Sequence, residues 1–170
     1  MHATTNDEPT QKRTILERRS DRELVLTRTI HGPARLVFDA YTKPELLKRW
    51  WAPASMGVSM FSCEIDPRVG GRYRYAYGRD PKQQMAFSGT FTEVVPHERL
   101  VCTSLFEQMP AAGEAIVTTT FTERDGKTVV VLHQLFPSKQ VMDGAIAAGM
   151  ENGMRITMDQ LEELVVALRG

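Results

Sequence analysis

The stretch SKQVMDGAIAAGMENGMRITMDQLEELVVAL, residues 138–168, decides the fold, because no proline interrupts it and its apolar residues recur at helical spacing. Ser138 is the predicted N-cap, since its hydroxyl can accept a hydrogen bond from a free amide of the first turn. A helix of about thirty residues would be about 45 Å long. Its apolar stripe consists of Met142, Ile146, Met150, Met154, Met158, Leu161, Leu164, Val165 and Leu168. The stretch therefore predicts one long C-terminal helix with a buried side. Gly149 and Gly153 leave two interpretations open, a close approach to a neighbouring element or room for a cavity.

The residues before this helix alternate with the period of β-strands. Tyr73, Tyr75 and Tyr77 share one face, opposite Arg72 and Arg74, which predicts a strand with an aromatic inner side. The other strands are predicted at residues 23–30, 60–66, 85–91, 99–105, 116–122 and 128–136. Two short helices are predicted between the first two strands, at residues 33–41 and 42–51, with Thr42 as the N-cap of the second.

This order of elements predicts an α+β fold. Strands joined by short turns pair antiparallel, and the isolated first strand can pair only with a free edge, which gives seven strands in the order 2-3-4-5-6-7-1. A sheet of this width curls around the long helix, and the part of its concave face that the helix leaves uncovered would be a cavity. We expect a flexible N-terminal arm at residues 1–20 and a single domain at residues 21–170.

Composition excludes several classes of partner. Lys and Arg together number 21, as do Asp and Glu, so no net field favours nucleic acid or an anionic membrane. The beginning of the chain lacks the apolar core of a secretory signal, and no later run approaches a membrane span, so we expect a cytoplasmic protein. Cys63 and Cys102 have no zinc spacing, which favours two free thiols.

Several segments also resemble a known family. They are Trp50-Trp51-Ala52-Pro53, Glu64 to Tyr73 with the pair Gly70-Gly71, Gly89 to Val101, Phe136-Pro137-Ser138, Gly149 to Met154, and Leu161 to Leu164. Together they are similar to homologues of the activator of the 90-kilodalton heat-shock protein ATPase, within the SRPBCC, START-like or birch-pollen-allergen-like superfamily. The resemblance covers residues 21–168 and implies a helix-grip fold. The superfamily includes lipid carriers, polyketide cyclases and co-chaperone domains.

The candidate site is the predicted concavity. Aromatic and methionine side chains would form its wall, since such a wall adapts to flat, apolar ligands. These residues are Tyr73, Tyr75, Met85, Phe87, Leu105, Met150 and Met154, with Trp50 or Trp51 closing the mouth. Polar groups that could orient a ligand are Thr118, Thr120 and Gln134. Strand parity sets His133 opposite Gln134, and we favour Gln134 as the inward residue.

No catalytic constellation stands out. Glu64 and Asp66 lie two apart near three arginines, and surface ion pairing explains them better than acid–base chemistry. The histidines have no metal-ligand spacing, so we nominate no metal, cofactor or catalytic residue. The leading hypothesis is a binding protein for a small hydrophobic or aromatic molecule. The alternatives are a co-chaperone or stress-response interaction protein and an enzyme of the cyclase or dehydratase kind. Oligomeric state is left open.

Overall fold

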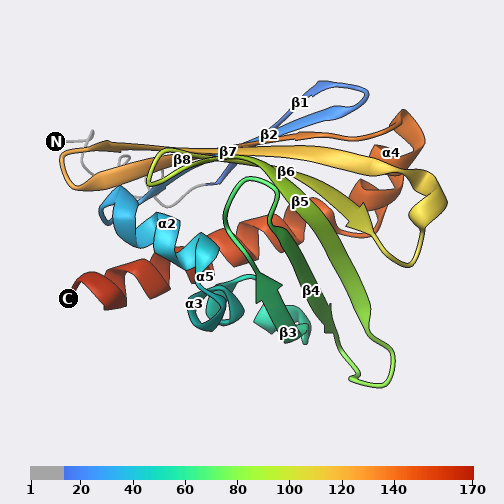
Figure 1. Ribbon diagram of the computed structural model, residues 1–170, viewed down its shortest axis with the longest axis horizontal. Coiled ribbons are helices and arrows are strands. Elements are labelled where there is room, and N and C mark those ends of the chain that lie inside the picture. Colours follow the sequence, from blue (N-terminus) through green and yellow to red (C-terminus); the bar gives the residue numbers. More distant parts are fainter. Residues whose placement is uncertain (1–13) are drawn as a thin grey trace, which may run out of the picture.

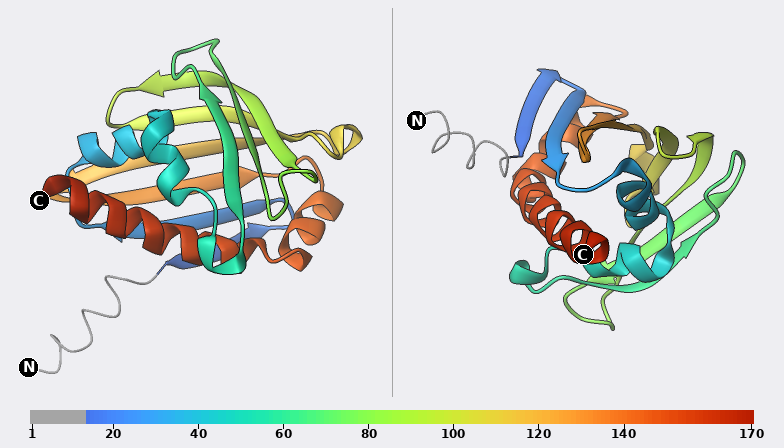
Figure 2. Two further views of the ribbon diagram at one scale, coloured as in Figure 1. Left: turned by 90° about the horizontal axis from the view of Figure 1, so that it is seen from below. Right: turned by 90° about the vertical axis from the view of Figure 1, so that its left-hand side faces the viewer.

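The computed structural model describes residues 14–170, and its main feature is an eight-stranded antiparallel sheet in the order β1-β2-β8-β7-β6-β5-β4-β3 (Figure 1). The strands are β1 (Ile15–Ser20), β2 (Glu23–Ile30), β3 (Ser59–Ile65), β4 (Arg72–Gly78), β5 (Met85–Val95), β6 (Arg99–Phe106), β7 (Glu114–Arg124) and β8 (Lys127–Leu135). The helices are α2 (Ala34–Thr42), α3 (Pro44–Trp50), α4 (Lys139–Ala147) and α5 (Met150–Arg169), with short 3-10 turns η1 (Ala54–Met56) and η2 (Pro110–Ala112). The sheet curves around α5, which confirms the α+β helix-grip fold (Figure 2).

The predicted strand count and order were wrong at one edge of the sheet. The sequence predicts seven strands in the order 2-3-4-5-6-7-1, whereas β1 pairs with the outer edge of β2 and makes an eighth. This strand lies within the arm predicted at residues 1–20, and residues 1–13 lie outside the described part of the chain. Leu16 of β1 packs against both apolar clusters of the core. This burial offsets the entropy lost when the strand becomes ordered.

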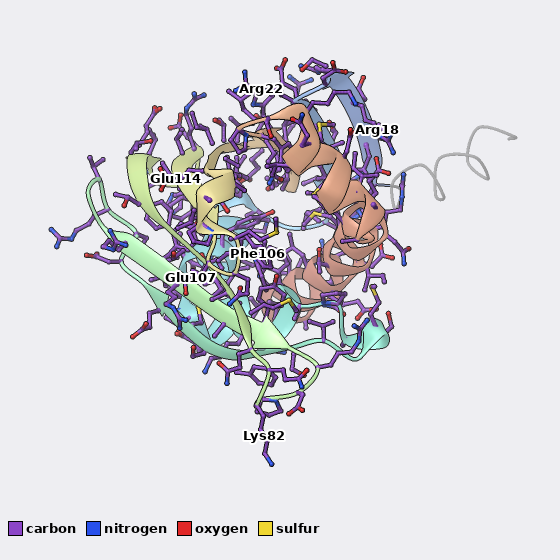
Figure 3. The ribbon with its side chains drawn as sticks, turned by 90° about the vertical axis from the view of Figure 1, so that its right-hand side faces the viewer. Arg18, Arg22, Lys82, Phe106, Glu107 and Glu114 are labelled. Atoms are coloured by element: carbon purple, nitrogen blue, oxygen red, sulfur yellow. The ribbon has the colours of Figure 1, made fainter. Side chains whose placement is uncertain are left out.

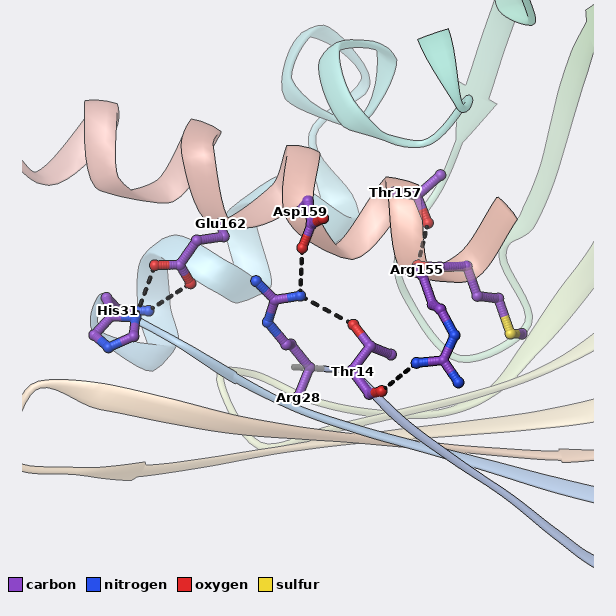
Figure 4. Close-up of polar contacts among 8 residues, drawn as sticks. Thr14, Arg28, His31, Arg155, Thr157, Asp159 and Glu162 are labelled. Carbon is purple, nitrogen blue, oxygen red and sulfur yellow. Dashed lines mark hydrogen bonds and ion pairs between the residues drawn. The ribbon is translucent and has the colours of Figure 1, made fainter. Parts of the chain in front are cut away.

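Polar contacts also hold β1 and β2 against α5 (Figure 4). Buried Arg28 of β2 donates to Asp159 Oδ1 at 2.7 Å and to Thr14 Oγ1 at 2.9 Å. Arg155 of α5 donates to the carbonyl oxygen of Thr14 at 2.6 Å. One residue in front of β1 is therefore bound by two arginines, from β2 and from α5.

The predicted single C-terminal helix is broken into two. Ser138 is the N-cap, as predicted, since its Oγ accepts a hydrogen bond from the Val141 amide at 3.2 Å. The break between α4 and α5 falls at Gly149, whose φ of 96° lies in the left-handed region that favours glycine. Gly153 instead faces Pro53, because a Cβ added there would lie 4.0 Å from the proline Cγ. Gly149 thus breaks the helix, whereas a Cβ at Gly153 would make only an ordinary van der Waals contact.

The two short helices form where they are predicted, with one difference at their junction. Lys43, not Thr42, is the N-cap residue of α3, and Pro44 occupies its first turn. The hydroxyl of Thr42 donates back to the carbonyl of Phe38 at 2.8 Å, so it ends α2 and is not free to cap the next helix.

The helices seal one half of the concave face. Helix α5 packs against β2, α2 lies against β7 and β8, and the two helices also contact each other. The side chains between them are 0–8% exposed and define what we call the sealed half: Leu26, Ile30, Val37, Phe38, Phe121, Val130, Leu161 and Val165. This half supplies the densest part of the core, and the site described below lies beyond it.

Candidate functional site

The register of β3 to β6 brings a set of aromatic side chains to the concave face. Tyr73, Tyr75 and Tyr77 of β4 pair with Gly89, Phe87 and Met85 of β5, and Phe87 in turn pairs with Phe106 of β6. Directly paired residues of antiparallel strands share a face. Trp51, just after α3, covers this group from the helix side. We call Trp51, Tyr75, Tyr77, Phe87 and Phe106 the aromatic face.

Ring contacts tie the aromatic face together. The ring centroid of Trp51 lies 5.4 Å from that of Tyr75, 5.2 Å from Tyr77 and 6.2 Å from Phe87. Phe87 is stacked on Tyr77 at 5.6 Å and lies 5.2 Å from Phe106. In the end view of the molecule, Phe106 lies in the region bordered by the sheet and the C-terminal helices (Figure 3). Such offset and edge-on pairs are the preferred geometries of aromatic rings.

These side chains point inward and nevertheless keep solvent-accessible surface. All five residues of the aromatic face are partly buried, as are the inward Met85 and Met154. By contrast, Tyr73 is 6% exposed, because its ring lies over Gly89 and its hydroxyl donates to the Thr103 carbonyl at 2.6 Å. The inner surface is therefore closed at Tyr73, whereas the residues that carry the neighbouring rings keep partial exposure. Neither of the two hollows described below is lined by the aromatic face.

Three of the predicted lining residues point the wrong way. Leu105 pairs with Ser88 and Glu114, and these residues occupy the convex face. Thr118 and Thr120 pair with His133 and Val131, also on the convex face. The segment Thr118-Thr119-Thr120 gives no hydrophobic alternation from which to choose a parity, and only pairing settles it. The inward neighbours are Phe106 and Thr119, and Phe106 is the functional candidate that the sequence analysis missed.

Gln134 points inward, as predicted, and His133 points outward. Gln134 pairs with Leu24 and Val117, whose side chains belong to the concave face. On the other face, His133 Nε2 lies 2.9 Å from Glu23 Oε1. The hydrogen bond to His133 lowers the pKa of the Glu23 carboxyl below its ordinary value. This ion pair accounts for His133 as a surface residue.

The two tryptophans have separate roles. Trp50 is 3% exposed, and its Nε1 donates to the Ala40 carbonyl at 2.8 Å, so it joins α3 to α2. Trp51 is the tryptophan of the aromatic face. Met150 packs against the apolar cluster beneath α4, and Met154 packs against both this cluster and the main core.

Burial moves the pKa of the tyrosine hydroxyls and cysteine thiols of this region even further above neutral pH. Burial raises the pKa of Tyr77 to about 12 and raises that of Tyr75 well above its ordinary value. It also raises the pKa of the Cys63 and Cys102 thiols to about 11. Both cysteines are free. Tyr75 and Tyr77 can therefore donate hydrogen bonds, and they make poor bases.

Two hollows are present elsewhere on the surface. One of about 220 Å³ lies on the convex side and is lined by Glu64, Arg72, Tyr73, Arg74, Ser88 and Glu107. Here Arg74 binds Glu107 through two nitrogens at 3.0 Å, and Arg68 pairs with Asp66 at 2.8 Å. The predicted surface ion pairing thus holds for Asp66. The second hollow, of about 340 Å³, lies between α3 and α5 and is lined by Arg49, Ala54, Gln160, Glu163 and Leu164.

Residues 14–170 contain neither a membrane-spanning helix nor a cluster of metal ligands. None of the helices in this part of the chain is long and apolar enough to cross a membrane. Nor do three His, Cys, Asp or Glu residues within it lie together in a way that could hold a metal ion.

The curved sheet around α5 and the inward aromatic face define the class of protein as a helix-grip fold of the SRPBCC, START-like type. The chain belongs to the family described as activator of Hsp90 ATPase homolog 1-like protein, whose model matches residues 31–166. This confirms the family predicted from the resemblance. No curated protein matches the chain.

Solved structures share this fold. A protein from Rhodobacter sphaeroides is similar with a TM-score of 0.82 and 21% identity, covering 91% of this chain and 99% of its own. A protein from Nitrosomonas europaea has a TM-score of 0.77 and 28% identity, covering 88% and 97%. A protein from Staphylococcus epidermidis has a TM-score of 0.74 and 27% identity, covering 90% and 94%. A likeness at 21% identity shows a shared fold and nothing more.

Proposed function

We propose that the protein binds a small hydrophobic or aromatic molecule against the aromatic face. One observation carries the proposal: five aromatic side chains that point into the concave side keep accessible surface. Covering such surface is favourable, by about 25 cal/mol for each Å² of apolar area removed from water. Aromatic side chains also offer a flat ligand the offset and edge-on contacts that rings prefer.

The alternatives have less support. The six large apolar side chains that are strongly exposed within residues 14–170 are distributed over five separate segments: Ile15, Val69, Met109, Ile116, Val166 and Leu168. A partner surface usually gathers such residues into one patch. For the enzyme alternative, Tyr75 and Tyr77 keep their protons at neutral pH and supply donors without a matching base.

A fluorescent apolar probe tests the proposal. N-phenyl-1-naphthylamine emits weakly in water and brightly in an apolar site, so titration with the protein should give saturable enhancement. Trp51→Ala should weaken binding at least tenfold, because Trp51 contacts three other rings of the aromatic face. Val69→Ala is the control, since Val69 is 65% exposed in the turn after β3.

Two results would count against the proposal. The first is the absence of any saturable enhancement with the unaltered protein. The second is enhancement that Trp51→Ala leaves unchanged in a folded variant, since binding would then lie elsewhere. Circular dichroism establishes that the variants are folded.

A further inference from the structure

We infer that the ligand is uncharged and that Gln134 binds its polar group, an inference that rests on the proposed function. The first step concerns the inward positions of the sheet. Strands β3 to β8 lie within residues 59–135, all of which the structure describes. On these strands, Glu123 is the one charged residue whose side chain shares the concave face. Its carboxylate accepts a hydrogen bond from the Ala34 amide at 2.8 Å, at the start of α2 in the sealed half.

The second step concerns α5, which faces the sheet. Four of its charged residues bind partners at the β1 and β2 edge or in the turn that follows β2, and Figure 4 shows the contacts of Arg155, Asp159 and Glu162. The pairs are Glu151 with Arg18, Arg155 with the Thr14 carbonyl, Asp159 with Arg28, and Glu162 with His31. These contacts draw the charges of the helix away from β4 to β6. An ion bound between Gln134 and Phe106 would therefore lose hydration without gaining a counter-ion from α5. The cation that acts on this side of the sheet is Lys48 of α3, at the β3 edge, where its charge partly offsets the rise in the pKa of Cys63.

The third step concerns hydrogen bonding. Gln134 is inward, partly buried, and makes no side-chain hydrogen bond to another residue of the described chain. Its cross-strand neighbours, Leu24 and Val117, are apolar. A primary amide offers both a donor and an acceptor, and in such surroundings it gains from a partner that replaces water. Gln134 can therefore pair with a neutral amine, hydroxyl or carbonyl.

The fourth step sets the size of the ligand. Gln134 lies on β8 and Phe106 on β6, two strands away, which is a separation of about 10 Å across the sheet. Along the strand direction the two residues are offset by four positions, about 13 Å. Both side chains point into the concave side and shorten the gap between them. A molecule of two or three rings can stack on the aromatic face and reach the amide, whereas a single ring is too short.

A matched pair of probes tests the charge. N-phenyl-1-naphthylamine and 1-anilinonaphthalene-8-sulfonate share one ring system and differ by a sulfonate. The unaltered protein should bind the neutral probe at least tenfold more tightly. Equal affinity for the two probes would overturn the inference on charge while leaving the proposed function intact. Failure of both probes to bind would instead contradict the proposed function.

Substitutions at Gln134 test its role. Gln134→Leu should lower the affinity for N-phenyl-1-naphthylamine about fivefold, which is the effect of losing one hydrogen bond. Gln134→Lys should raise the affinity for the sulfonate probe. His133→Gln, one residue away on the opposite face, should change neither affinity. If Gln134→Leu is folded and binds the neutral probe as tightly as the unaltered protein, Gln134 does not contact the ligand. The charge test uses the unaltered protein and stands even where a variant does not fold.

Discussion

The concave face divides into the sealed half and the part that carries the aromatic face, which we call the aromatic half, and only the sealed half is fully buried. In the sealed half, Val130, Leu161 and Val165 are 0% exposed, because α2 and α5 both cover this end of the sheet. Over β4 to β6, the residues of the aromatic face remain partly exposed. The difference follows helix coverage, because two helices pack over the sealed half, whereas the main contact of α5 with the sheet is with β2.

The largest expected effect is a loss of stability in the sealed half. Leu161→Ala should lower the free energy of unfolding by about 3 kcal/mol, since it leaves a cavity among side chains that cannot collapse into it. Urea denaturation measures this change. Leu168→Ala, on the same helix and 37% exposed, is the control and should cost less than about 1 kcal/mol. If the two variants lost similar amounts of unfolding free energy, the sealed half would not be more densely packed than the exposed side of α5.

A somewhat smaller effect is expected where the aromatic half is closed. A Cβ at Gly89 would overlap the Thr103 carbonyl oxygen and would lie 2.8 Å from Tyr73 Cε1. Gly89→Ala should therefore displace Tyr73 and destabilise the protein by about 2 kcal/mol. Gly144→Ala is the matched control, since no heavy atom lies within 4 Å of the added Cβ in α4. It should stabilise the protein by up to about 1 kcal/mol. Thermal unfolding measures whether each of the two variants is more or less stable than the unaltered protein.

A substitution in the aromatic face should affect binding more than stability. Phe106→Leu should cost less than about 1.5 kcal/mol of unfolding free energy, because the ring is partly exposed and its replacement is apolar. The same change should weaken binding of N-phenyl-1-naphthylamine, and this binding can be measured with the same preparation of the protein. A stability loss as large as that of Leu161→Ala would show that the aromatic half is as densely packed as the sealed half.

The sequence predicts the sheet and the aromatic inner side because alternation fixes which face a strand buries. It predicts β4 correctly from three tyrosines, and Gln134 from its neighbours Val130 and Leu132. It fails where alternation carries no signal, as in the threonines of β7, and where a strand ends, as at Leu105 and Phe106. A bulge at Phe61 in β3 likewise turns Met60 toward the core, and no local pattern announces it.

Long-range partners explain the other errors. The polar segment before Asp21 looks unable to fold by composition, yet Thr14 and Arg18 bind α5 residues more than 130 positions away. The break at Gly149 depends on the direction that α4 must take to cover Leu24 and Phe136. Whether the aromatic face stays accessible depends on where α5 lies, which the apolar stripe of the helix does not specify.

The smallest expected effect is an acid-dependent loosening of the aromatic half. The hydrogen bond from Arg74 lowers the pKa of Glu107 below its ordinary value of 4.5. The folded-state pKa is thus below the unfolded one, so this ion pair stabilises the protein above pH 4.5 and the stabilisation is lost as pH falls through the folded pKa. Both side chains are partly exposed, and Glu107→Gln should cost less than about 1 kcal/mol at neutral pH.

Hydrogen exchange can locate this loosening. Because Arg74 lies in β4 and Glu107 directly follows β6, Glu107→Gln should speed amide exchange in β4 to β6 while β2 and β8 stay protected. Glu151→Gln is the control, since Glu151 binds Arg18 and its loss should loosen β1 instead. Faster exchange spread evenly over all strands in the Glu107 variant would mean that the two halves unfold as one unit, and that their different exposure has no counterpart in local stability.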